Sequence, residues 1–149
     1  MKTLALTCIL SFAAAVAWAQ DSSLTGNWTR GDRANSATCK IEQQSGNVTF
    51  RIDKHFSGGT LSGGSTETET YTADGVERDR KGDNGRQIWF TAYWQARSLV
   101  ILQLSKDGYH VLSTRETWTV SDDGVTLTKT TRRVDMDGIA ESTEEFQRH

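Results

Sequence analysis

The second half of the chain, from Ile88 to Phe146, consists of short runs in which apolar and polar residues alternate. Alternation with a period of two is typical of β-strands that bury one face. The last three turns between these runs each contain Asp followed by Gly, at Asp107-Gly108, Asp123-Gly124 and Asp137-Gly138. These residue types favour tight chain reversal. The pattern predicts five consecutive antiparallel strands.

Each of these three turns predicts a register that places apolar residues opposite apolar ones, or acids opposite bases. A turn at Lys106–Gly108 predicts the pairs Leu102–Leu112 and Leu104–His110. A turn at Ser121–Gly124 predicts Val120–Val125, Trp118–Leu127 and Glu116–Lys129. A turn at Asp135–Gly138 predicts Val134–Ile139, Arg132–Glu141, Lys129–Glu144 and Leu127–Phe146.

With these registers, one face of the predicted sheet changes character along its length. Its apolar level contains Trp118, Val120, Val125, Leu127 and Phe146. Its polar level contains Glu116, Lys129, Thr131, Arg133 and Glu144. The gradient favours a closed antiparallel barrel with a packed aromatic base and a polar mouth. The alternative is a sandwich whose charged half-face is simply solvated.

The first half of the chain predicts further strands around Leu24–Trp28, Thr38–Gln44, Val48–Asp53, Thr66–Thr72 and Val76–Lys81. Cys39 alternates in register with Ile41, which predicts a buried thiol. A glycine-rich stretch, Ser57–Ser65, is interpreted as a flexible connector. Proline is absent, so Gly, Asn and Asp must form the turns.

The first 19 residues have the features of a secretory signal peptide. Lys2 precedes the apolar run Leu4–Val16, and Ala17-Trp18-Ala19 fits the small-x-small cleavage pattern. We therefore expect residues 1–19 to be removed and residues 20–149 to form one barrel domain. The sequence predicts a secreted or periplasmic protein without a transmembrane segment.

Composition and motifs exclude several classes of function. The formal net charge of −2, with no cluster of basic residues, argues against a nucleic-acid partner. No metal-binding spacing of His or Cys and no nucleophile motif is present, so we expect a non-enzymatic protein without a cofactor. The segment Arg133–Glu144 partly matches a calcium-binding loop. However, Arg133 stands where the first ligand is required, which favours a hairpin turn.

The opening motif Leu24-Thr25-Gly26-Asn27-Trp28 resembles the first strand of lipocalins and related calycin barrels. Together with the later segment Thr117–Thr128, it makes the chain similar to small secreted bacterial lipocalin-like proteins. The resemblance implies a single antiparallel up-and-down β-barrel of about eight strands, in which a late arginine packs across Trp28. Arg132, Arg133 and Arg148 are the candidates. Ser23–Thr29 also resembles the opening of avidin-type barrels, but Arg30 and Ala34 do not match the polar biotin contacts of that family.

The leading hypothesis is an exported barrel that binds a small hydrophobic or amphipathic molecule. The candidate interior residues are Trp28, Trp118, Leu127 and Phe146 at the base, with His110, Glu116, Lys129 and Arg133 nearer the mouth. The alternative is an envelope interaction or inhibitor module with a packed interior. In that case the face around Trp89 and Tyr93 would contact a protein partner or a second copy of the chain.

Overall fold

The computed structural model describes residues 23–31, 35–58, 61–82 and 85–149. The predicted signal peptide lies outside these residues. The described chain is all β, with ten strands whose bounds are listed here in order: β1 (Gly26–Gly31), β2 (Asn35–Gln44), β3 (Asn47–Gly58), β4 (Leu61–Thr72), β5 (Arg78–Lys81), β6 (Gln87–Gln95), β7 (Ser98–Asp107), β8 (His110–Val120), β9 (Thr126–Asp135) and β10 (Gly138–Arg148). None of the described segments is a helix long and apolar enough to cross a membrane.

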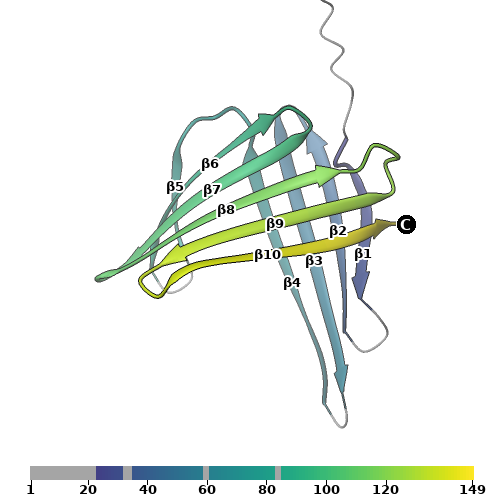
Figure 1. Ribbon diagram of the computed structural model, residues 1–149, viewed down its shortest axis with the longest axis horizontal. Helices are drawn as coiled ribbons and strands as arrows, with labels where there is room; N and C mark the ends of the chain where they lie inside the picture. Colours follow the sequence, from purple (N-terminus) through teal and green to yellow (C-terminus); the bar gives the residue numbers. More distant parts are fainter. Residues whose placement is uncertain (1–22, 32–34, 59–60, 83–84) are drawn as a thin grey trace, which may run out of the picture.

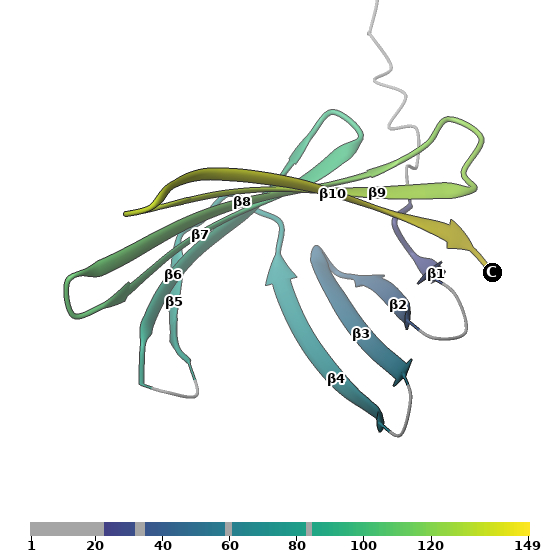
Figure 2. The same ribbon diagram turned by 60° about the horizontal axis from the view of Figure 1, so that its bottom comes forward.

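The ten strands form one antiparallel sheet in the order β4-β3-β2-β1-β10-β9-β8-β7-β6-β5. Each strand therefore pairs with its neighbours in sequence, except that β10 pairs with β1, and β4 and β5 form the two edges. Strands β6–β10 cross strands β2–β4 (Figure 1), and the sheet curves so that both edges come to the same side (Figure 2). The architecture is the predicted up-and-down β-barrel, with ten described strands rather than about eight. The value of about eight came from the resemblance, whereas the strand runs expected from the sequence pattern each correspond to one strand, including the short and fully charged β5.

The described residues form one hydrophobic core between the two halves of the sheet. It includes Trp28 and Cys39 from the first half, and Trp118, Leu127 and Phe146 from the second. The predicted burial of Cys39 is confirmed, since its side chain is fully buried. The inward-facing residues come from both halves at alternating positions, as the sequence pattern predicts for a sheet with one buried face.

The three predicted registers have different outcomes. The β9–β10 register is confirmed, with Lys129 opposite Glu144 and Leu127 opposite Phe146. The hairpin interpretation of Asp135–Gly138 is confirmed as well, because these two residues pair across the turn.

The β8–β9 register is wrong by two residues. Trp118 lies opposite Lys129, and Val120 opposite Leu127. A shift of two keeps every side chain on its predicted face.

The predicted register between β7 and β8 is wrong, and the error assigns side chains to the wrong face of the sheet. The turn is formed by Gly108 and Tyr109, so Asp107 pairs with His110 and Leu104 pairs with Ser113. The predicted partner of Leu104 was His110, three positions away. Because three is an odd shift, Leu104 points outward while His110 lies on the inward side of β8.

The glycine-rich stretch predicted as a connector is mainly strand. The ends of β3 and β4 pair through Phe56 and Gly63, while residues 59–60 at the tip lie outside the described ranges. A Cβ atom at Gly63 would lie 2.6 Å from Cζ of Phe56. The absence of a side chain at Gly63 therefore lets the Phe56 ring lie across the neighbouring strand, which explains a glycine inside a strand.

Candidate ligand-binding site

The base of the barrel is a packed aromatic cluster. The ring of Trp118 lies 4.7 Å from that of Phe50 and 6.3 Å from that of Phe146, measured between centroids. Trp28 is fully buried, and its indole Nε1 donates a hydrogen bond of 2.9 Å to the carbonyl oxygen of Leu24. Of the three candidate arginines, Arg148 lies over the Trp28 ring, with its Cζ 4.5 Å from the centroid.

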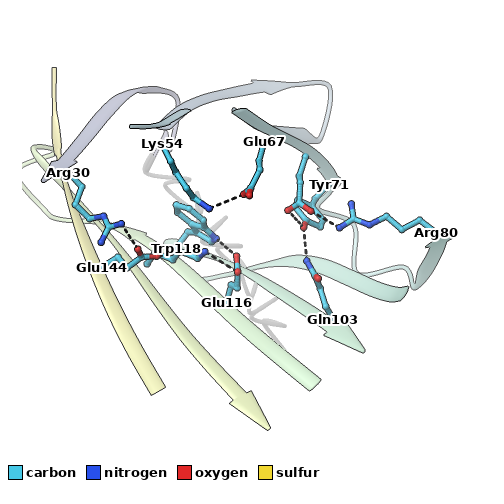
Figure 3. Close-up of polar contacts among 11 residues, drawn as sticks. Arg30, Lys54, Glu67, Tyr71, Arg80, Gln103, Glu116, Trp118 and Glu144 are labelled. Carbon is cyan, nitrogen blue, oxygen red and sulfur yellow. Dashed lines mark hydrogen bonds and ion pairs between the residues drawn. The ribbon is translucent and has the colours of Figure 1, made fainter. Parts of the chain in front are cut away.

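Two carboxylates and two cationic side chains lie next to this aromatic cluster. Figure 3 labels three of them: Arg30, Glu116 and Glu144. Lys129 Nζ is 3.0 Å from Glu116 Oε1 and 3.9 Å from Glu144 Oε2. Arg30 extends from β1 and lies 3.0 Å from the other oxygen of Glu144. Trp118 Nε1 donates a hydrogen bond of 3.1 Å to Glu116, and Lys129 Nζ lies 5.0 Å from the centre of the Trp118 ring. We call Arg30, Glu116, Lys129 and Glu144 the interior charge cluster.

A hollow of about 100 Å³, which we call the interior hollow, lies between this cluster and the opposite wall of the barrel. On that wall, Lys54 of β3 and Glu67 of β4 form an ion pair of 3.1 Å. The lining residues of the hollow are Arg30, Ala37, Ile52, Lys54, Glu67, Trp118, Lys129, Glu144 and Phe146. The hollow thus has an apolar floor and charged walls. It lies above the base, which is itself packed.

Side-chain contacts connect the two sheet edges, which share no backbone ladder among the described residues. Arg80 of β5 is 2.7 Å from Glu69 of β4, and its guanidinium lies over the rings of Tyr71 and Phe90. Tyr71 donates to Glu69 at 2.6 Å and accepts a hydrogen bond from Gln103 of β7 at 2.6 Å. Burial, followed by the neighbouring Glu69 charge, raises the pKa of Tyr71 well above its usual range, so this hydroxyl stays protonated.

A larger hollow of about 730 Å³, which we call the edge hollow, lies where the two sheet edges β4 and β5 face each other. Its lining residues are Thr66, Glu67, Thr68, Glu69, Arg80, Lys81, Gly82, Arg86 and Ile88. Glu67 lines this edge hollow and the interior hollow, so the two meet at that residue. The edge hollow is the larger and the more open of the two.

The structure separates the sequence-predicted site residues into three groups. Trp118, Phe146 and Lys129 line the interior hollow, and Glu116 contacts two of them. Trp28 and Leu127 are fully buried in the base and do not line it.

His110 and Arg133 lie elsewhere. They line a hollow of about 310 Å³ beside the β7–β8 and β9–β10 turns, where Arg133 pairs with Asp135 at 2.9 Å. The described residues contain no group of three or more His, Cys, Asp or Glu that could hold a metal ion.

Sequence reasoning missed five residues of the interior hollow: Arg30, Ala37, Ile52, Lys54 and Glu67. Glu144, which also lines it, was predicted for the polar level of the inner face but not as a site residue. Two of the five missed residues carry a signal in the sequence. Arg30 stands two positions after Trp28 and therefore shares its face of β1. Lys54 similarly continues the alternation of Phe50 and Ile52 along β3. Glu67 carries no comparable signal, because β4 is polar on both faces over most of its length.

A row of apolar side chains crosses the outside of the barrel. Adjacent pairs place Trp89, Leu104, Ser113, Val134 and Ile139 side by side across β6–β10. Leu104, Val134 and Ile139 are 42%, 36% and 63% exposed. Trp89 and Tyr93 are each partly exposed, so the predicted aromatic surface on β6 is only half covered.

The buried thiol of Cys39 provides a pH-dependent test of the core. Burial raises the pKa of Cys39 to about 12, and the nearby charge of Lys129 offsets part of that shift. The unfolded thiol ionises near pH ~8.5, so the thiol contributes its full stabilisation below that pH and loses it as pH rises toward 12. Between pH 8 and pH 10 we expect the free energy of unfolding to fall by about 1.5 kcal/mol more in the wild type than in Cys39→Ala.

The measurement is urea unfolding followed by circular dichroism at both pH values. Tyr71 has a raised pKa in both proteins, so its contribution to the alkaline loss cancels in the comparison. Equal pH dependence in the two proteins would contradict the burial of a neutral thiol.

Comparison with known proteins shows the fold of the chain. No protein-family model and no curated protein matches the sequence. Among solved structures, the REP1-NXSQ fatty acid transporter is similar, with 16% identity, a TM-score of 0.58, and coverage of 85% of this chain and 96% of the other.

Two further solved structures are similar over most of their length. Secretory abundant heat soluble protein 4 from Ramazzottius varieornatus has 13% identity and a TM-score of 0.56, covering 84% of this chain and 94% of the other. The zebrafish ileal bile acid-binding protein complexed with cholic acid has 14% identity and a TM-score of 0.53, covering 84% and 98%. At these identities the similarity concerns the fold alone. The chain therefore has the antiparallel β-barrel fold of these solved structures.

Proposed function

We propose that this protein is an exported, non-enzymatic barrel that binds a small hydrophobic or amphipathic molecule. The observation that carries the proposal is the environment of Trp118. Its ring forms the floor of the interior hollow, while its Nε1 and the neighbouring Lys129 belong to a charged layer directly above. Apolar walls with a few placed polar groups are characteristic of ligand sites. Two of the similar solved structures are named as a fatty acid transporter and a bile acid-binding protein, which supports the proposal at the level of the fold.

In this proposal the apolar end of the ligand lies against Trp118, Phe146 and Ile52. Its polar group lies among the interior charge cluster. The edge hollow, which meets the interior hollow at Glu67, holds the part of the ligand that stays nearest to water. Export is supported by the signal-peptide pattern of residues 1–19. We expect protein recovered outside the cytoplasm to begin at Gln20 on N-terminal sequencing.

The test is binding of the uncharged dye Nile red, measured by its fluorescence and by the intrinsic fluorescence of tryptophan. Ala37 is 4% exposed and lines the interior hollow, so Ala37→Leu fills part of that space and is expected to weaken dye binding at least tenfold. Ala140→Leu is the matched control. Ala140 is exposed near the β9–β10 turn and lines neither the interior nor the edge hollow. Circular dichroism checks that both variants are folded.

Absence of dye binding to the wild type, or equal effects of the two substitutions, would contradict binding in the interior hollow.

A second candidate function is association with a protein partner or a second copy, favoured by the outer apolar row of Trp89, Leu104, Val134 and Ile139. A mass that increases with protein concentration, without dye binding, would favour that function instead.

A further inference from the structure

The charged residues around the interior hollow are balanced in number and in position. Each of the three cations that line it lies within 4 Å of a carboxylate: Arg30 with Glu144, Lys129 with Glu116 and Glu144, and Lys54 with Glu67. At the sheet edge, Arg80 is paired with Glu69 in the same way. Together with Glu116, which contacts Lys129 but does not itself line the hollow, these pairs place three carboxylates beside the three cations.

The pairs nearest the aromatic floor are also the most protected from water. The side chains of Lys129 and Glu116 are 16% and 20% exposed, and that of Glu144 is 30% exposed. Ion pairs in such positions are weakly screened by solvent, and separating them leaves a charge without its partner in a region of low dielectric.

An amphiphile with a carboxylate headgroup would have to compete with Glu116 or Glu144 for Lys129. Binding would then add one negative charge to a balanced cluster and leave a protein carboxylate partly unpaired. A cationic amphiphile would meet the opposite difficulty, because it would compete with Lys129 or Arg30 for Glu144. For both types of amphiphile, the free energy lost at the charge cluster offsets part of the binding free energy that the apolar contacts contribute.

A headgroup without net charge avoids this loss. A lysine ammonium has three N–H donors and an arginine guanidinium has five, so both can donate to a hydroxyl or ester oxygen without leaving their carboxylates. A zwitterionic headgroup brings one charge of each sign, and the cluster stays balanced when it binds.

We propose that the interior hollow selects amphiphiles without net charge, uncharged or zwitterionic, over anionic or cationic amphiphiles of the same chain length. This selectivity rests on the binding function proposed above. This selectivity distinguishes the protein from a carrier of free fatty acids, although a similar solved structure is named a fatty acid transporter.

The first experiment compares four dodecyl amphiphiles in displacing Nile red from the full domain, each below its micelle concentration. They are monolaurin, dodecylphosphocholine, laurate and dodecyltrimethylammonium. We expect monolaurin or dodecylphosphocholine to bind at least tenfold more tightly than laurate and dodecyltrimethylammonium. Whichever of the first two binds more tightly distinguishes a glyceride from a phosphocholine ligand.

The second experiment changes the charge balance. Glu144→Gln removes the carboxylate shared by Arg30 and Lys129, and is expected to tighten laurate binding about tenfold while changing monolaurin binding less than threefold. Glu141→Gln is the matched control on the same strand. Glu141 points outward and pairs with Arg132 at 3.3 Å on the surface, so the selectivity should stay as in the wild type.

The outcomes separate the two proposals. Laurate binding as tightly as the uncharged and zwitterionic amphiphiles would overturn the selectivity and leave the binding function in place. Failure of Nile red and all four amphiphiles to bind would overturn both. If Glu144→Gln does not fold, the wild-type comparison of the four amphiphiles still decides the selectivity.

Discussion

Replacing Trp28 with alanine is expected to lower the free energy of unfolding by about 4 kcal/mol, because a fully buried aromatic side chain is lost from a packed core. Two further contacts are lost with the ring. One is the hydrogen bond from Nε1 to the carbonyl oxygen of Leu24, and the other is the contact with Arg148 at 4.5 Å. Arg148 belongs to β10 and Trp28 to β1, so the ring stabilises the pairing that joins the two ends of the described chain.

The measurement is urea unfolding at neutral pH, followed by far-ultraviolet circular dichroism. Trp94→Ala is the control, since Trp94 is 37% exposed and its removal is expected to cost about half as much as that of Trp28, about 2 kcal/mol. Arg148→Ala separates the contribution of the guanidinium, for which we expect about 1 kcal/mol. Equal losses for Trp28→Ala and Trp94→Ala would contradict the place of Trp28 in the core.

The β9–β10 hairpin could be predicted correctly because two independent signals agree there. Asp137 and Gly138 mark the turn, and on both sides of it Arg132 meets Glu141 and Lys129 meets Glu144. Any slip would set like charges opposite one another or move Leu127 away from Phe146. A register with several such constraints has few alternatives.

The register of β7 with β8 could not be predicted in the same way. Leu99, Val100, Ile101 and Leu102 are consecutive apolar residues, so this strand has no polar face that would set its parity. Lys106 and Asp107 were interpreted as turn residues, whereas both continue the ladder and pair with Val111 and His110. Polar residues extend strands easily where the hairpin projects beyond the core.

The β8–β9 register was wrong because side chains hold a longer loop than the Asp-Gly motif indicates. Ser121 Oγ donates to Asp123 at 2.5 Å and accepts from the backbone N–H of Thr126 at 2.9 Å. The backbone N–H of Val125 donates to Asp123 Oδ1 at 3.1 Å. These bonds keep Val125 out of the ladder, where it is 48% exposed.

The candidate site could be predicted only for the half of its wall that comes from the hairpins. Glu116, Lys129 and Trp118 follow from alternation along β8 and β9. The other lining residues Arg30, Lys54 and Glu67 come from β1, β3 and β4, which meet β8 and β9 around the hollow only after the whole sheet has curved. Contacts across a barrel depend on curvature and closure, and a local pattern of side chains does not fix either.

Lys129→Met is expected to lower the free energy of unfolding by about 2 kcal/mol, because it leaves Glu116 without its cation beside the aromatic floor. The value is below that of a fully buried pair, since Lys129 and Glu116 retain some exposure to solvent. Glu144 keeps Arg30 at 3.0 Å, so the loss concerns mainly Glu116. Lys40→Met is the matched control. Lys40 pairs with Glu42 on the surface at 2.6 Å, and its replacement should leave stability unchanged within error.

The double variant Lys129→Met with Glu116→Gln distinguishes loss of a charge partner from loss of packing. The glutamine oxygen can still accept the hydrogen bond from Trp118 Nε1, and no unpaired carboxylate remains. We therefore expect the double variant to recover at least about 1 kcal/mol relative to Lys129→Met, measured by urea unfolding in a double-mutant cycle. Strictly additive losses would mean that Lys129 stabilises the fold through the contact of its side chain with the Trp118 ring. The pairing of charges in the interior charge cluster would then not be the source of its stabilising effect.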